Sequence, residues 1–233
     1  MKYNVLKGKK ISDFDDLLSI CIGKSLSNQL LFSKMFVFKS KWSLDFDRGL
    51  IYFHDINKSF SMEIIGTELL DTSTWLWAWA DSSIPTNLSK KSKKLRDIGI
   101  KYDIDVLKKD GFILNGNMSG KNISLIATIL DEENVVYYRG AFPGGYIYMY
   151  IGGLSEKVFE QLSAVESLIL FNQVSHKYNI NDRLMVQSFF ELNDNVLGVK
   201  KDNIIGIYNM KSQLIVKFLN NKIVDMKIKK RIN

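Results

Sequence analysis

The sequence has 233 residues, of which 46% are hydrophobic and 24% charged, with only two prolines, as is typical of an ordered globular protein. The single cysteine, Cys21, excludes an internal disulfide and a multi-cysteine zinc site. The formal net charge of +7 is concentrated in residues 90–109, with eight basic and three acidic side chains, and residues 211–233, with seven and one. Such local basicity bears on partners, but no function follows from composition alone.

No stretch reaches the roughly 20 apolar residues that a membrane span needs, and the N-terminus lacks the apolar core of a signal peptide. We therefore expect a cytoplasmic protein without a membrane partner. The two histidines, His54 and His176, lie far apart and in no ligand-like spacing. We accordingly expect no metal site, no cofactor and no recognisable catalytic set.

The first half of the chain alternates between helical and strand patterns. Apolar residues at spacings of three, four and seven predict one or two helices over residues 12–38. Residues 42–55 read as a β-hairpin around the turn 47–49, and residues 59–70 continue as a third strand. In residues 75–81, WLWAWAD, strict alternation predicts a strand with three tryptophans on one face.

The next segments predict a basic amphipathic helix over residues 86–99 and a short helix over residues 122–133. Two strands then flank a Pro-Gly-Gly turn, and the second of them carries alternating tyrosines. A long amphipathic helix is predicted from Ser155 to about Tyr178.

From Asp182 onward the apolar period changes to two, and we expect only short strands separated by polar turns. The predicted fold class is α+β: an antiparallel sheet flanked by helices, followed by a C-terminal antiparallel β meander. The predicted domains are residues 1–180 and the meander of residues 181–233, packed together because the linker is short.

The Trp-rich run at residues 75–81 resembles an uncharacterised bacterial family whose members carry a Trp-Leu-Trp-Ala-Trp-Ala-Asn segment. This chain has Asp81 in place of the final asparagine. The resemblance covers about residues 12–150, and it implies an α+β fold and a bacterial or phage origin but no activity and no residue roles. Weaker matches follow the Trp-rich run, at Ile84, Pro85, Leu95, Arg96, Gly99, Tyr138 and Arg139.

The aromatic rows have two interpretations. They can fill the core, since each indole buries a large area. Alternatively, the two rows lie on neighbouring strands and line a groove that stacks a planar, nucleotide-like ligand, with Arg139 or Lys101 holding its phosphate. The candidate ligand-binding residues are Trp75, Trp77, Trp79, Tyr138, Arg139, Tyr146, Tyr148 and Tyr150.

The basic helix also has two interpretations: a solvated face, or a surface that contacts phosphates or an acidic protein. No groove-reading motif accompanies it, so we do not expect sequence-specific binding of nucleic acid. The candidate contact residues are Lys90, Lys91, Lys93, Lys94 and Arg96.

Two hypotheses about function follow. The first is a non-enzymatic binding protein that engages a partner protein or a small nucleotide-like ligand, with an immunity or anti-defence role as its context. The alternative is a small-molecule enzyme with dispersed acid-base residues. A pocket in which a carboxylate or histidine with a shifted pKa lies against the tyrosine face would indicate such an enzyme. The sequence leaves open whether the chain forms a homo-oligomer.

Overall fold

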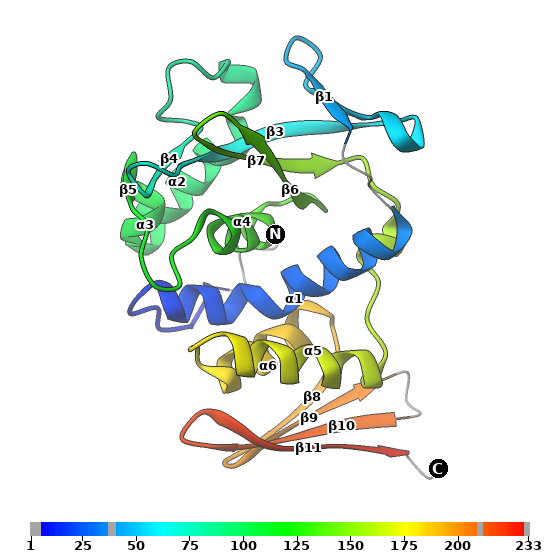
Figure 1. Ribbon diagram of the computed structural model, residues 1–233. Coiled ribbons are helices and arrows are strands. Elements are labelled where there is room, and N and C mark those ends of the chain that lie inside the picture. Colours follow the sequence, from blue (N-terminus) through cyan, green and yellow to red (C-terminus); the bar gives the residue numbers. More distant parts are fainter. Residues whose placement is uncertain (1–5, 37–40, 209–211, 231–233) are drawn as a thin grey trace. The chain divides into compact units, whose positions relative to one another are not determined.

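A computed structural model describes residues 6–36, 41–208 and 212–230 (Figure 1). Its helices and antiparallel sheets confirm the predicted α+β fold class. The described residues form two compact units: the first lies within residues 28–159, and the second combines residues 6–27 with the described part of the chain from Glu160 onward. A domain boundary near residue 180 stays a prediction.

Helix α1 (Phe14–Met35) confirms the first predicted helix. It begins after Asp13, whose Oδ1 accepts a hydrogen bond from the Asp16 backbone N–H at 2.9 Å. This contact satisfies one of the donors that a helix start leaves unpaired. The boundary between the two units falls inside α1, after Ser27.

The first unit contains a seven-stranded antiparallel sheet. The long strand β3 organises it, because β2 and β4 pair along one edge of β3 and β7 along the other. The two predicted hairpins are confirmed as β1–β2 and β6–β7. The strands are β1 (Trp42–Asp45), β2 (Leu50–Phe53), β3 (Lys58–Leu69), β4 (Thr74–Trp77), β5 (Gly111–Ile113), β6 (Val136–Phe142) and β7 (Gly145–Gly152).

The Trp-rich strand is shorter than its alternation predicts. It ends at Trp77, and residues 78–80 form a turn. The Trp77 N–H donates to the Asp110 carbonyl and the Ala78 N–H to the Ile65 carbonyl, both at 3.0 Å. These are the last bonds between β4 and its neighbours. The Ala80 N–H then donates to the Trp77 carbonyl at 3.0 Å, which closes the turn and ends the strand. Strand β5, which pairs with β4, was not predicted.

Helices flank the sheet as predicted. The basic amphipathic helix is α2 (Lys90–Tyr102), preceded by the 3-10 turn η3 (Thr86–Leu88) and followed by α3 (Asp105–Lys108). Helix α4 (Gly120–Leu130) is buried along nearly its whole length and contacts β3, β6 and β7. The opposite side holds a hydrophobic cluster that includes Phe32, Ile51, Phe53, Ile64, Met149 and Ile151.

The second unit contains a four-stranded antiparallel sheet in the order β11-β10-β9-β8, which confirms the predicted meander. Helices α5 (Ala164–Lys177) and α6 (Asp182–Leu192) lie along one side of it (Figure 1). The strands are β8 (Val196–Lys200), β9 (Asn203–Tyr208), β10 (Ser212–Leu219) and β11 (Lys222–Lys230).

Two predictions near this sheet are wrong. Residues 182–192 form helix α6, not a strand: Asn181 caps it by accepting the Leu184 N–H at 3.0 Å, and its buried side chains recur at helical spacing. The helix predicted from Ser155 is only the 3-10 turn η4 (Glu156–Val158) there. α5 starts at Ala164, after a capping box in which Ser163 and Glu166 satisfy each other's backbone N–H groups.

Candidate functional site

The structure brings the tryptophan and tyrosine rows onto one face of the sheet, with β3 between them. Gly66 of β3 lies opposite Trp77 on one side and Tyr148 on the other, and directly opposed residues project to the same face. Gly66 has no side chain, so the Trp75 ring can lie over it. The ring centroids of Trp75 and Tyr148 are consequently only 5.5 Å apart.

Most of these rings are interior. The side chains of Trp75, Trp77, Tyr148 and Tyr150 are at most 1% exposed, and α4 packs against this face. The Trp77 Nε1 donates to the Val106 carbonyl at 3.0 Å, which ties the strand to α3. These four rings therefore belong to the packed core of the unit.

Glu68 is a polar residue at this face that sequence reasoning missed. The Tyr148 hydroxyl donates to its Oε2 at 2.6 Å, and burial together with this hydrogen bond raises the pKa of Tyr148. Glu68 also lines a shallow depression of about 220 Å³ with Ser73, Asn115 and Ser119. Glu68 follows Gly66 by two residues in the same strand, so its side chain lies on the face that carries the aromatic rows, where it pairs with Trp75 and Tyr146. This alternation was the sequence signal that could have identified it.

The other predicted ligand-binding residues lie apart from that core. Trp79 is half-buried in the turn after β4, with the Arg96 guanidinium 4.6 Å above its ring centroid. Tyr146 is half-buried, and the Arg139 guanidinium stacks 4.4 Å from its ring centroid. Tyr138 projects to the opposite face, into the hydrophobic cluster. The structure thus separates these residues into three places, and a ligand site formed by them stays a prediction.

Helix α2 presents most of its cations to solvent. Lys90, Lys93, Lys94 and Arg96 are exposed, whereas Lys91 is half-buried. The Lys91 ammonium lies 3.0 Å from Asp131 and 2.8 Å from Glu133, and its backbone N–H donates to Glu63 at 2.9 Å. Lys91 therefore anchors the helix, and the other four candidate residues, together with the exposed Lys101, form its accessible basic surface.

The pKa values of Lys91 and its acidic neighbours are shifted in different directions. Burial lowers the pKa of Lys91, but the hydrogen bond to Glu133 and the charge of Asp131 offset this, and the net pKa is raised. The hydrogen bond from Lys91 lowers the pKa of Glu133, whereas burial raises the pKa of Glu63. The buried Tyr150 hydroxyl has no hydrogen-bond partner within the described parts of the chain. Its pKa is raised by burial and then by Asp131 and Glu63.

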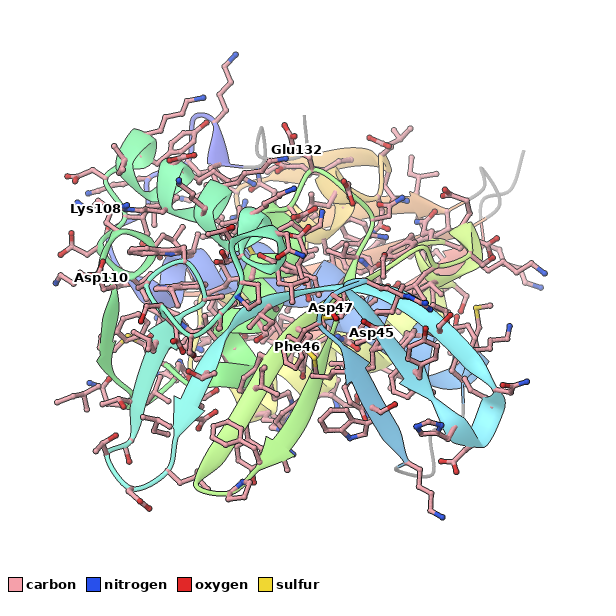
Figure 2. The ribbon with its side chains drawn as sticks, turned by 90° about the horizontal axis from the view of Figure 1, so that it is seen from above. Asp45, Phe46, Asp47, Lys108, Asp110 and Glu132 are labelled. Carbon is pink, nitrogen blue, oxygen red and sulfur yellow. The ribbon has the colours of Figure 1, made fainter. Side chains whose placement is uncertain are left out.

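A groove of about 330 Å³ lies between α2 and the end of α4. Its apolar lining is Leu95, Ile98 and Leu130. Glu132, which follows α4, lies at the surface beside α2 and is 3.7 Å from the Lys94 ammonium (Figure 2). The charged lining residues are Lys91, Lys94, Asp97, Lys101, Asp131 and Glu132.

Sequence reasoning selected Lys91 and Lys94 of this groove, and named Lys101 only as a phosphate contact beside the aromatic rows, but it missed the wall that α4 contributes. The available signal was charge complementarity between KKSKK at residues 90–94 and DEE at residues 131–133. Among the described residues, no three His, Cys, Asp or Glu side chains are grouped so that they could hold a metal ion.

The comparisons with known proteins identify one family. Residues 15–154 match the model of a family of unknown function, DUF6882. The chain belongs to this family. The DUF6882 region contains the whole seven-stranded sheet together with α2, α3 and α4, so the groove lies within it. The predicted resemblance to an uncharacterised family is confirmed at this level.

No curated protein and no solved structure matches the chain. Within residues 6–36, 41–208 and 212–230, none of the helices is both long and apolar enough to cross a membrane.

Proposed function

We propose that this DUF6882 protein is a non-enzymatic binding protein whose α2–α4 groove receives a segment of a partner protein. The observation that supports the proposal is the groove itself: an apolar floor beside the most basic of the described helices. Grooves between helices that combine apolar walls with a few polar groups are common binding sites.

The lining indicates the chemistry of the partner segment. Leu95, Ile98 and Leu130 offer a floor for one or two aliphatic or aromatic side chains. Its charged rim is balanced in sign, whereas Lys90 and Lys93 outside it carry no ion pair among the described contacts. A segment with an apolar anchor and flanking acidic residues complements both features.

A small nucleotide-like ligand is the other binding candidate that the sequence predicts. The rings of Trp75, Trp77, Tyr148 and Tyr150 are buried, so such a ligand would contact the accessible Arg139 and Tyr146 instead. A guanidinium and a phenol ring together suit a phosphate and a base.

The enzyme alternative has one supporting feature, the carboxyl of Glu63 with its raised pKa near Tyr150. Glu63 is not among the residues that line the groove, which favours binding over catalysis there. A bacterial or phage origin, a cytoplasmic location and an immunity or anti-defence role would suit a binding protein and stay predictions.

The test places a photo-crosslinking residue at Asp97, an exposed position in the groove, and at Lys157, an exposed position of the same unit outside it. We expect illumination in extracts of the source organism to capture one protein through position 97 and none through position 157. Peptide mapping should place the adduct in a segment with acidic residues around an apolar anchor.

A charge-reversal variant, Lys90→Glu with Lys93→Glu, should remove this capture, and Lys157→Glu should not. A synthetic peptide of the captured segment then gives the affinity by calorimetry. Equal capture from both positions, or capture unaffected by the reversed charges, would contradict the groove proposal.

A further inference from the structure

The β8–β11 sheet has a second face that none of the described helices of its own unit covers. Residues alternate along each strand, so that Ile204, Leu214 and Val216 are buried on the side of α5 and α6. Their neighbours project to the opposite side. We call that side the outer face.

Strand register places the outer-face residues in three rows across the sheet. One row contains Val196, Ile207, Gln213 and Lys229, and the next contains Gly198, Ile205, Ile215 and Lys227. The third row contains Lys200, Asn203, Lys217 and Asp225.

The first two rows form an apolar patch. Val196 is 60% exposed, and Ile205, Ile207 and Ile215 are half-buried. These four β-branched side chains are adjacent across β8, β9 and β10. Gly198 lies beside them, and a Cβ added there would find no heavy atom nearer than 3.8 Å. The patch is thus apolar, flat at its β8 edge, and open to solvent.

Lysines border this patch on two sides. Lys227 and Lys229 lie along β11, and Lys200 and Lys217 lie in the third row. Asp225 is the only acidic residue in the three rows, and it is 3.5 Å from the Lys217 ammonium. Lys200, Lys227 and Lys229 have no ion pair among the contacts of the described residues. The outer face therefore combines apolar contact area with uncompensated positive charge.

We propose that the outer face binds an acidic polypeptide segment that also carries aliphatic side chains. The apolar patch would bury the aliphatic side chains, and the lysines would pair with the carboxylates. Two copies of this chain would oppose like charges there. Single-stranded nucleic acid lacks a stacking platform, since the three rows contain no aromatic residue.

This surface belongs to the second unit and is independent of the α2–α4 groove, which lies in the first. Either proposal can therefore fail while the other holds.

The test uses a peptide of alternating glutamate and valine, with an alternating glutamate and serine peptide and an oligothymidylate of equal charge as comparisons. Isoleucine-methyl NMR of the full chain reports the place of binding. We expect the glutamate-valine peptide to shift the signals of Ile205, Ile207 and Ile215 and to leave that of Ile51, in the core of the other unit, unchanged.

Gly198 supplies a matched pair of variants, because either side chain fits there. Gly198→Glu should weaken binding of the glutamate-valine peptide about tenfold, and Gly198→Lys should not weaken it. Lys227→Glu with Lys229→Glu should weaken binding similarly, by a factor that shrinks as salt is added. Lys201→Glu, in the β8–β9 turn, is the charge control and should have little effect.

Four outcomes would overturn the proposal. These are no shift of the three isoleucine signals, equal binding of the glutamate-serine peptide, tighter binding of the oligothymidylate, and equal effects of glutamate and lysine at position 198. Unchanged far-ultraviolet circular dichroism and an unchanged signal of the buried Ile204 verify that each variant is folded.

Discussion

Gly66 shows how one residue without a side chain can determine the packing of a whole face. A Cβ at this position would lie 2.5 Å from both the Trp75 ring and the Leu76 carbonyl oxygen. The backbone oxygen cannot move aside as a flexible side chain can. The contact between the tryptophan and tyrosine rows therefore depends on glycine here.

We expect Gly66→Ala to lower the free energy of unfolding by about 1–3 kcal/mol, the usual range for overpacking a core. Urea unfolding followed by tryptophan fluorescence measures it. Gly198→Ala, at the open position on the outer face, is the matched control and should stay within about 0.5 kcal/mol of the unsubstituted chain. Equal stability of both variants would mean that the Trp75 ring does not occupy the space over Gly66.

The shifted pKa values of Glu63 and Glu133 predict that these two residues contribute to stability with opposite dependences on pH. Folding raises the pKa of Glu63, so its contribution to stability is complete below the ordinary glutamate pKa and is lost as pH rises through the raised value. Folding lowers the pKa of Glu133, so its contribution is present above the ordinary value and is lost as pH falls.

Relative to the unsubstituted chain, Glu63→Gln should therefore become more stable as pH rises, and its amide oxygen can still accept the Lys91 N–H. Glu133→Gln should be less stable at neutral pH, by a difference that disappears in acid. Urea midpoints between about pH 4 and 8 measure both. The same sign of pH dependence in the two variants would contradict these assignments.

At the scale of elements, the sequence was enough to predict a strand or helix wherever that element depends mainly on its own residues. Both hairpins of the first sheet and the meander follow from alternation around Gly, Asn, Asp and Pro turns. Helix α6 was missed because apolar residues are adjacent in the sequence of residues 182–192. The pattern therefore fits both the helical period of 3.6 residues and the strand period of two. Packing on α1 decides for the helix: Met185 and Phe189 lie against Gly23.

The groove was predictable only in part for the same reason. The basic side of α2 is a local pattern, so Lys90, Lys93 and Lys94 could be selected from the sequence. Leu130, Asp131 and Glu132 reach the groove through tertiary packing of α4, which no local pattern encodes. Burial of the aromatic rows is likewise a consequence of where α4 packs, and both interpretations of the rows were compatible with their alternation.

The capping box at the start of α5 gives a prediction at this scale. Ser163→Ala removes the side chain that accepts the Glu166 N–H and should cost about 0.5–2 kcal/mol. Ser155→Ala is the control, since Ser155 caps only the three-residue turn η4. Thermal unfolding compares them, and a larger loss for Ser155→Ala would contradict the observed start of α5.

At the scale of the whole molecule, the second unit is assembled from both ends of the chain. The Asn181 N–H donates to the Ser19 hydroxyl at 3.0 Å, and the Lys24 ammonium donates to the Asn193 side chain at 2.8 Å. Leu17, Leu18, Cys21 and Ile22 are fully buried. The helical layer over the meander therefore depends on the first helix of the chain.

We expect a chain that starts at Asn28 to lose the structure of residues 160–233, because four buried side chains contribute about 1.5–3 kcal/mol each against a typical stability of about 5–15 kcal/mol. Hydrogen exchange followed by mass spectrometry should show fast-exchanging amides in β9 and β10 and protected amides in β3 and β7. Protection of β9 and β10 in the shortened chain would contradict this expectation.

The discontinuous second unit also has a consequence during synthesis. The stretch ending at Ser27 leaves the ribosome before the first sheet has been made, yet its partners begin only at Glu160. At a translation rate of about 5–20 residues per second, its apolar side chains wait roughly ten seconds for them. In that interval the nascent chain exposes the apolar side chains of this segment. We expect a ribosome-associated chaperone to bind them, because exposed apolar surface on an incomplete chain promotes aggregation.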